Sequence, residues 1–223
     1  MMRMTRRAKQ NGRRAGRNPA RTRERILAAA LQEFAARGFA GSRVDAIARR
    51  AAINKRMLYH YFGDKEGLFR AVLRRKIAER QAWAESLSGD PTESLPFWFE
   101  TTCHDRDWVR LLEWEALQGG EHPVMDERQR QAATNKGLKR LRQQQVRGQI
   151  AGDLDPRHVM LAMRSLTMFP VAFPQLTKLI MGRPVSDPRF QRERIAFLKK
   201  FAAAFRPERR HRVKPNGGKT NLP

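Results

Sequence analysis

Four prolines in this chain directly follow an asparagine or an aspartate, in the pairs Asn18-Pro19, Asp90-Pro91, Asp155-Pro156 and Asp187-Pro188. Asp and Asn side chains cap the free N–H groups of a helix's first turn, and proline is favoured at the first helical position because its φ is already helical. Each pair therefore predicts the start of a helix. No segment shows sustained alternation of apolar and polar residues, which would indicate a strand. Together these features predict an all-α fold.

Apolar spacing and single capping residues predict further helices. Ile26, Leu27, Ala30, Leu31 and Phe34 recur three and four residues apart, so they form one apolar face of the first helix. Ser42, with Asp45 three residues later, is a variant capping box and predicts a second start. We expect helices that begin near residues 18, 42, 54, 64, 90, 105, 126, 155 and 187, with Gly38 ending the first and Pro170 and Pro174 stopping the eighth.

Basic residues are concentrated at the two ends of the chain. Residues 1–81 hold 22 Lys and Arg against 6 Asp and Glu, a net charge of +16, whereas residues 82–205 hold 18 against 15, a net of +3. The tail 206–223 adds +5, which completes the total of +24. Residues 1–17 and 207–223 show no apolar period and are predicted to be disordered basic segments. A local excess of this kind indicates a polyanionic partner, either nucleic acid or anionic lipid.

Several classes of protein are disfavoured by motifs that the sequence lacks. The single cysteine, Cys103, allows no intramolecular disulfide and no cysteine-based zinc site, and it fits a reducing compartment, so we expect a cytoplasmic protein. The sequence shows neither an apolar signal segment after its basic start nor a run of about 18 apolar residues. It contains no recognisable catalytic motif. We therefore expect no enzyme activity, no cofactor, no bound metal and no membrane association.

The segment 42–62 has the spacing of a helix-turn-helix, in which two short helices are joined by a tight turn. Ala51, Ala52 and Ile53 supply the small side chains and the apolar wedge that such a turn needs. In the second short helix, Leu58 and Phe62 lie four residues apart and are predicted to face the core. Its outward side chains are then Lys55, Arg56, Met57, Tyr59 and His60. The helix N-termini near Ser42 and Asn54 are suited to bind phosphate groups.

The segment "GFAGSRVDAIARRAAINKRMLYHYFGDKEGLFRAVL" resembles the DNA-binding domain of the TetR family of transcriptional repressors. The resemblance is close over about residues 20–75 and rests on four motifs. These are Gly-Phe after the first helix, Asp-x-Ile-Ala in the second helix, Leu-Tyr-x-x-Phe in the third helix, and Asp-Lys-Glu-x-Leu at the start of the fourth helix. The rest of the chain matches the family only in architecture. The resemblance implies a DNA-binding domain over 18–66 and an effector-binding and dimerisation domain over 67–206.

Two positions depart from the family pattern. The family usually has glycine where Ala52 stands, and a left-handed backbone there would cost alanine about 1 kcal/mol. The family usually has a small residue where Arg56 stands, and an arginine there can reach a base edge, preferably guanine. The operator sequence therefore cannot be taken from relatives.

The resemblance also implies roles for individual residues. Ser42, Arg43 and Lys65 would contact phosphates. Lys55, Arg56 and Met57 would enter the major groove, with Met57 on a thymine methyl group. Tyr59 and His60 would contact the DNA backbone, and Asn54 would cap the recognition helix.

The larger domain is less clearly specified. The resemblance implies that the last two long helices pair with a second copy, and Val159, Met163, Leu166, Phe169, Leu198, Phe201 and Phe205 are the candidates for that interface. Each of these two apolar faces fits an intrachain core equally well. Candidate effector-pocket residues are Trp83, Trp98, Trp108, Trp114, Met125 and Met163, and ordinary core packing is the alternative for each.

These observations give one leading hypothesis and one alternative. The leading hypothesis is a homodimeric repressor that binds a pseudo-palindromic double-stranded operator and is released by a small hydrophobic effector. The alternative is a protein that binds nucleic acid without sequence preference, or an anionic membrane surface, through its charge alone. The sequence does not identify the effector, the operator or the regulated genes.

Overall fold

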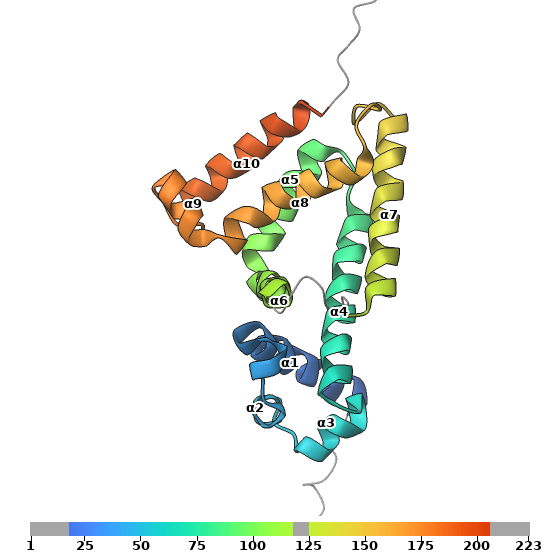
Figure 1. The fold of residues 1–223 in the computed structure, drawn as a ribbon, viewed down its shortest axis with the longest axis vertical. Helices are drawn as coiled ribbons and strands as arrows, with labels where there is room; N and C mark the ends of the chain where they lie inside the picture. The colour runs from blue at the N-terminus through green and yellow to red at the C-terminus, as the bar shows by residue number, and fades with distance from the viewer. Residues whose placement is uncertain (1–17, 118–124, 206–223) are drawn as a thin grey trace, which may run out of the picture. The chain divides into compact units, whose positions relative to one another are not determined.

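The structure is a computed structural model that describes residues 18–117 and 125–205, and within these ranges it contains ten helices and no strand (Figure 1). The all-α prediction is therefore confirmed. The predicted basic segments 1–17 and 207–223 lie outside the described residues. The helices are α1 (Pro19–Gly41), α2 (Val44–Arg50), α3 (Lys55–Phe62), α4 (Lys65–Ser86), α5 (Pro91–His104), α6 (Arg106–Leu117), α7 (Glu127–Val146), α8 (Pro156–Ala172), α9 (Pro174–Met181) and α10 (Pro188–Ala203).

All four predicted Asn-Pro and Asp-Pro starts carry the expected cap. Asn18 Oδ1 accepts hydrogen bonds from the N–H groups of Ala20 and Arg21, and Asp90 Oδ1 accepts from the N–H of Thr92 at 2.8 Å. Asp155 Oδ1 accepts from the N–H of Arg157 at 2.7 Å, and Asp187 Oδ1 accepts from that of Arg189 at 2.7 Å. In each case proline follows at the first helical position. Local capping chemistry therefore marks these four helix starts.

Contacts divide the chain into two compact units at points that differ from the predicted 66/67 boundary. Among the described residues, the first unit contains 18–82, 105–117 and 125–130, and the second contains 83–104 and 131–205. Most of α4 and all of α6 thus belong to the same unit as the helix-turn-helix. The division passes through α4, near its C-terminal end.

The first unit is built around the apolar face predicted for α1. Ile26, Leu27, Ala30 and Phe34 of that face are fully or almost fully buried. The Phe34 ring meets the Phe69 ring of α4 edge to face, with 4.8 Å between centroids. This packing fixes α1 against α4 and leaves α2 and α3 to cover the remaining apolar surface.

Helix α6 is attached to α1 at the point where α1 breaks. Gly38 has a φ of +68°, so the backbone leaves the helical conformation inside α1, as the glycine predicted. The Trp114 ring of α6 lies directly against Gly38, because an added Cβ there would be only 2.9 Å from Trp114 Cδ2. The indole N–H of Trp114 donates to the carbonyl of Ala35 at 3.1 Å, and Arg110 Nε donates to the same carbonyl at 3.1 Å. Trp114 is thus a structural anchor in the first unit.

In the second unit, α5 packs against both α8 and α10. Phe99 of α5 meets Phe190 of α10 edge to face at 6.2 Å, and Leu95 and Leu198 are fully buried. Leu141, Ile150 and Val159 form a further buried cluster, with Met160 and Met163 packed on it. The core of this unit therefore lies on α5, and α7 joins it through Leu141.

The predicted stop at Pro170 is wrong, because α8 continues through this proline to Ala172. A proline inside a helix removes the hydrogen bond to the carbonyl four residues earlier, which here belongs to Leu166. Arg194 of α10 donates to that carbonyl instead, through Nη2 at 2.8 Å. A contact from a distant helix thus satisfies the carbonyl left free by Pro170. Pro174 then starts α9, a helix that the sequence patterns did not predict.

Candidate nucleic-acid interface

The turn between α2 and α3 has the left-handed residue that the family pattern implies. Ala52 has a φ of +50°, a conformation that favours glycine over alanine. Arg25 of α1 reaches this turn and donates through Nη2 to the carbonyl oxygens of Ala51 and Ala52. The strained turn is therefore held from outside, by a residue that the sequence analysis did not single out.

Helix α3 has a buried and an exposed face, but Met57, predicted to face outward, and Phe62, predicted to face the core, are both half-buried. Asn54 Oδ1 accepts from the Met57 N–H at 2.7 Å and caps the helix. Leu58 is fully buried and anchors the inner face. Lys55, Arg56, Tyr59 and His60 are exposed, whereas Met57, Tyr61 and Phe62 are half-buried. The outer face of α3 thus offers two cations, a phenol and an imidazole on a helix of only eight residues.

Lys55, at the start of α3, is paired with a carboxylate of α2. Its Nζ lies 3.1 Å from Asp45 Oδ1 and 3.3 Å from Oδ2. The hydrogen bond to Asp45 and the negative charge of Asp45 raise the pKa of Lys55. Both side chains are exposed, so the pair fixes a direction for the lysine more than it adds stability.

Two further predicted contact residues make hydrogen bonds to the last turn of α1: Ser42, which follows it, and Lys65, the first residue of α4. Ser42 is almost fully buried, and its hydroxyl donates to the Phe39 carbonyl at 2.8 Å. Lys65 Nζ donates to the Ala40 carbonyl at 3.2 Å and lies 4.9 Å from the centre of the Phe39 ring. The prediction that Ser42 starts the second helix is wrong: it closes α1, and Arg43 is the residue before α2. The phosphate contacts of Ser42, Arg43 and Lys65 stay predictions.

Helix α2 lacks a side-chain cap of its own, and a carboxylate of α1 takes that place. Glu33 Oε1 accepts from the Arg43 N–H at 3.3 Å, and Glu33 is only 3% exposed. Sequence reasoning missed this residue and Arg25. For Glu33 a signal was present, because it follows Ile26 by seven positions and Ala30 by three, which places it on the apolar face of α1.

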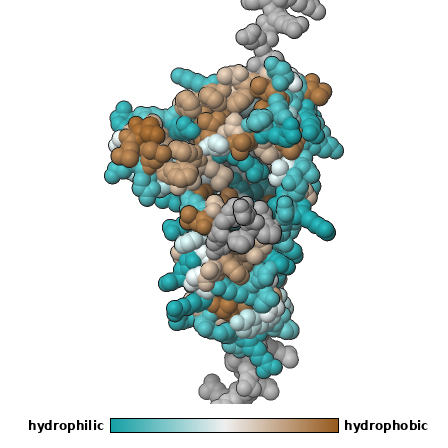
Figure 2. Space-filling view, viewed as in Figure 1, coloured by the Kyte–Doolittle hydropathy of each residue, from teal (hydrophilic) through white to brown (hydrophobic). Residues whose placement is uncertain are grey.

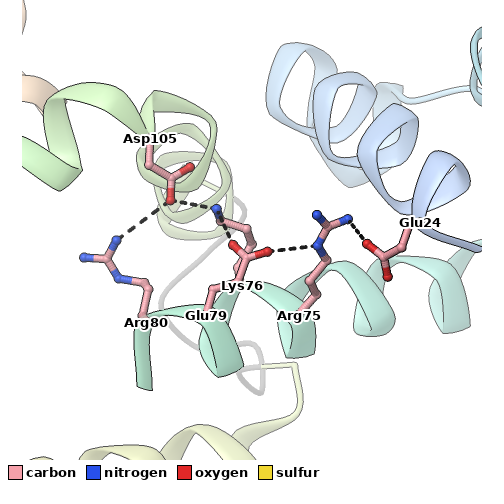
Figure 3. A network of polar contacts seen from close by, with 6 residues as sticks. All are labelled: Glu24, Arg75, Lys76, Glu79, Arg80 and Asp105. Carbon is pink, nitrogen blue, oxygen red and sulfur yellow. Dashed lines mark hydrogen bonds and ion pairs between the residues drawn. The ribbon is translucent and has the colours of Figure 1, made fainter. Parts of the chain in front are cut away.

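Ion pairs connect α1, α4 and the residue before α6 within the first unit (Figure 3). Arg75 joins Glu24 at 2.8 Å to Glu79 at 2.9 Å. Lys76 Nζ lies 3.0 Å from Glu79 and 2.8 Å from Asp105, which Arg80 also approaches. Burial alone would raise the pKa of Glu79, but the hydrogen bonds and charges of Lys76 and Arg75 outweigh it, and the pKa is lowered. This network ties three elements of the helix-turn-helix unit together.

The six candidate pocket residues do not share one unit. Trp108, Trp114 and Met125 belong to the first unit, and Trp83, Trp98 and Met163 belong to the second. Trp108 is buried with the Arg80 guanidinium 5.7 Å from its ring, and Met163 packs on the cluster around Leu141. Trp108 and Trp114 thus have packing roles of their own in the first unit.

The candidate dimer residues also divide into two kinds. Val159 and Leu198 are buried within a single chain, Met163, Leu166 and Phe205 are half-buried, and Phe169 and Phe201 are exposed. The exposed large apolar side chains of α8, α9 and α10, with Phe173 between α8 and α9, form what we call the apolar face of the second unit. They are Leu161, Phe169, Phe173, Leu176, Leu179, Ile180, Met181, Phe197 and Phe201. Figure 2 shows hydrophobic atoms gathered over α9.

Within residues 18–117 and 125–205, no group of three or more His, Cys, Asp or Glu side chains is arranged to hold a metal ion. Among the same residues no single helix is both long and apolar enough to cross a membrane. The pair α8 and α9 meets the length and composition criteria only when joined across a bend of 91°.

Comparisons with known proteins agree with the helix-turn-helix geometry. Residues 26–72 match the family described as bacterial regulatory proteins of the tetR family, and residues 98–203 match the tetracyclin repressor-like C-terminal domain. The HTH-type transcriptional repressor SCO4008 of Streptomyces coelicolor is 31% identical over 173 residues, which are 75% of this chain and 88% of that protein. The repressor NicS of Pseudomonas putida is 28% identical over 193 residues, which are 82% of this chain and 91% of that protein.

A solved structure extends the similarity to the whole fold. The transcriptional regulator SCO4942 of Streptomyces coelicolor superposes with a TM-score of 0.69 at 29% identity, covering 83% of this chain and 98% of that one. The two matched domains together span most of the described residues, in the order that the family requires. This chain therefore belongs to the TetR family of bacterial helix-turn-helix transcriptional regulators, which are DNA-binding repressors.

Proposed function

We propose that this protein is a homodimeric cytoplasmic repressor that binds a pseudo-palindromic operator through α3 and is released from it by a small hydrophobic effector. The observation that carries the proposal is the construction of α3. One face is anchored by the fully buried Leu58, the N-terminus is capped by Asn54, and the opposite face exposes Lys55, Arg56, Tyr59 and His60. A capped, anchored helix with cations at its N-terminal end is suited to enter the major groove.

Within α3, the residues divide between reading bases and contacting the backbone. Arg56 is exposed in the first turn, where a guanidinium can donate two hydrogen bonds to a guanine. Lys55 already has a carboxylate partner, so we propose that it enters the groove together with Asp45, which limits the directions it can take. Tyr59 and His60 lie further along the same exposed face and suit phosphate contacts.

Dimerisation is supported by the apolar face of the second unit. The ring centroids of Phe169 and Phe173 are 5.1 Å apart, and those of Phe197 and Phe201 are 5.6 Å apart. The exposed rings therefore pack in pairs. Exposed apolar side chains that gather into a large patch are rare on monomeric proteins and mark interaction sites. A second copy of the same chain is the partner proposed here, because two reading helices related by a twofold axis match a pseudo-palindrome.

The effector is proposed by chemical class alone, as a small hydrophobic molecule. Among the candidate residues, Trp83, Trp98 and Met163 belong to the second unit and are half-buried. We propose that they contact a hydrophobic effector. Release would follow from linkage, since an effector that favours one spacing of the two α3 helices lowers the affinity for an operator that needs another.

DNA binding can be tested by fluorescence anisotropy. The wild-type protein would select an operator from random double-stranded DNA, and its affinity for that operator would be compared with its affinity for a scrambled duplex. We expect a preference of at least a thousandfold, as for specific DNA-binding proteins. Equal affinity for both duplexes, or stronger binding to vesicles of anionic lipid, would contradict the proposal and support charge-driven binding.

The role of Arg56 can be separated from a general charge effect. Arg56→Ala should weaken operator binding by roughly tenfold to a hundredfold, and the loss should disappear when one base pair of the operator is changed. Arg142→Ala is the matched control, because Arg142 is an exposed arginine of α7 in the second unit. A loss that is the same on every sequence would assign Arg56 to a phosphate contact.

A further inference from the structure

Glu33 is a buried carboxylate in the middle of an otherwise apolar helix face. It is 3% exposed and lies next to Phe34, which is fully buried. An ionised carboxylate in such a place is costly unless it is paired and hydrogen-bonded. The partners of the Glu33 carboxylate therefore indicate its role.

The contacts of Glu33 lead to both ends of α2. Oε1 accepts the N–H of Arg43, the residue before α2, at 3.3 Å. Oε2 lies 3.7 Å from Nη1 of Arg50, the last residue of α2. Arg37, one turn later on α1, completes the site with Nε 3.4 Å from Oε1. One carboxylate thus holds the beginning and the end of a seven-residue helix.

Helix α2 has few other means of holding its position. It has no side-chain cap, and its buried apolar residues are Ile47 and Ala48. It also carries Asp45, whose carboxylate pairs with Lys55 at the start of α3. A displacement of α2 relative to α1 would therefore move the partner that orients Lys55. The contacts form a continuous path from Glu33 through α2 to the recognition helix.

The same carboxylate restrains two exposed cations of the helix-turn-helix unit, one on α1 and one on α2. The side chains of Arg37 and Arg50 are 63% and 47% exposed, and each has one contact to Glu33. Arginine side chains that no partner holds in place can bind DNA phosphates, and this binding does not depend on the DNA sequence. By holding them, Glu33 limits the part of the binding that does not discriminate between sequences.

We infer that Glu33 is a positioning residue that sets the sequence specificity of DNA binding, because it fixes α2 at both ends and restrains Arg37 and Arg50. The inference rests on the proposed function, since it concerns the same DNA interface. It predicts opposite changes for specific and non-specific DNA. Loss of the charge weakens operator binding, because α2 and Lys55 are less well placed, and strengthens binding to random DNA, because two arginines are released.

The test uses Glu33→Gln in the full-length protein. Glutamine has nearly the same shape and keeps an oxygen that can accept the Arg43 N–H, so the substitution removes mainly the charge. Operator affinity should fall about tenfold, and affinity for scrambled DNA should rise about twofold. The plot of log affinity for scrambled DNA against log salt should steepen by about one phosphate contact. Binding is measured well below the melting temperature of each variant.

Glu24→Gln is the matched control. Glu24 lies on the same helix α1 and carries the same charge, and its ion pair is with Arg75 of α4 instead of with α2. It should leave the ratio of operator affinity to scrambled-DNA affinity near the wild-type value. If Glu33→Gln lowers the melting temperature but leaves this ratio and the salt dependence unchanged, Glu33 has only a structural role and the inference is overturned.

Arg50→Gln tests the same contact from its more exposed side. In the Arg50→Gln background, Glu33→Gln should change the affinity ratio much less than it does in the wild type, because the two residues act through one contact. Fully additive effects would overturn the inference. A wild-type protein without preference for its selected operator would instead contradict the proposed function itself, so the two failures are distinguishable.

Discussion

The two units of the molecule differ in how completely they cover their apolar side chains. In the first unit, Tyr59 and Leu117 are the exposed large apolar residues among those described. The second unit exposes eleven such residues, nine of which form the apolar face of α8, α9 and α10. The first unit therefore has the surface of a finished domain that meets polar partners. The second leaves many large apolar side chains exposed, which is typical of a surface that binds another apolar surface.

The units also differ in how their backbones are held. In the first unit, charged side chains of α1 reach across to α2 and to the α2–α3 turn, through Glu33 and Arg25. In the second unit, Arg194 of α10 donates to the Leu166 carbonyl of α8, which Pro170 leaves without its helical partner. Polar contacts between helices thus determine local geometry in both units, but only the first unit places its polar contacts beside the proposed DNA interface.

The largest expected effect concerns the apolar face of the second unit. Phe169→Glu combined with Phe201→Glu should convert the dimer to a monomer, because both rings are exposed in the single chain and would be buried against a second copy. Operator affinity should then fall more than a hundredfold, since the two reading heads no longer bind as one molecule. Light scattering and anisotropy measure the two quantities.

Val146→Glu is the control for this double variant. Val146 is also an exposed apolar residue of the second unit, 89% exposed, but it lies on α7 outside the apolar face. It should leave both the mass and the operator affinity unchanged. A double variant that remains dimeric would show that the second copy binds elsewhere, and the difference between the two units would then need another explanation.

The next largest effect is expected at Pro170. Arg194→Ala removes the donor to the Leu166 carbonyl and should lower the free energy of unfolding by about 1 kcal/mol, the low end of the penalty for an unpaired acceptor, because this hydrogen bond is only partly buried. Burial lowers the pKa of Arg194, which agrees with a guanidinium placed between helices. Urea unfolding followed by circular dichroism measures the change.

Pro170→Ala gives the decisive comparison. An alanine at this position restores an N–H that can donate to the Leu166 carbonyl within α8. Arg194→Ala should therefore cost clearly less in the Pro170→Ala background than in the wild type. If the cost is the same in both backgrounds, the role of Arg194 is packing on Phe197, whose ring centre lies 5.0 Å from its guanidinium.

These two regions show which parts of the structure could be predicted from sequence. The starts of α1, α8 and α10 depend on a cap and a proline that are adjacent in the chain, so local pattern was sufficient. Helix α8 continues past Pro170, and the carbonyl that this proline leaves free accepts a hydrogen bond from Arg194, 24 residues after the proline. A pattern of neighbouring residues cannot predict such a contact. The eight-residue α9 was missed although Leu176, Leu179 and Ile180 recur three and four residues apart, because Pro174 was interpreted as the end of one helix and not as the first residue of the next.

The candidate site follows the same division. The exposed face of α3 and the buried Leu58 follow from helical periodicity, and the left-handed Ala52 follows from the family pattern. Ser42 was misplaced because a serine before a helix and a serine after a helix look alike when the two helices are separated by two residues. The contacts of Glu33 and Arg25 require the packing of α1 on α2, which the sequence does not supply.

A smaller effect is expected at the turn of the helix-turn-helix. Ala52→Gly should raise the free energy of unfolding by up to about 1 kcal/mol, because glycine adopts a φ of +50° without the steric cost that alanine has. Ala28→Gly, at an exposed position inside α1, is the control and should have the opposite sign, since glycine destabilises a helix interior. A destabilising effect of Ala52→Gly would mean that the contact from Arg25 already removes the strain at this turn.

The smallest expected effect tests whether the ion pairs of the first unit contribute to its stability. The pKa of Glu79 is lowered in the folded state, so the unfolded chain binds more protons and this carboxylate stabilises the fold above its unfolded pKa of about 4.3. That contribution is lost as the pH falls through the folded pKa. Glu79→Gln should therefore reduce stability near pH 7 by less than about 1 kcal/mol, because Glu79 is about one-third exposed, and should flatten the loss of stability below pH 5. Glu127→Gln on α7 is the control, and an unchanged acid profile in Glu79→Gln would show that the network in Figure 3 orients α4 without stabilising it.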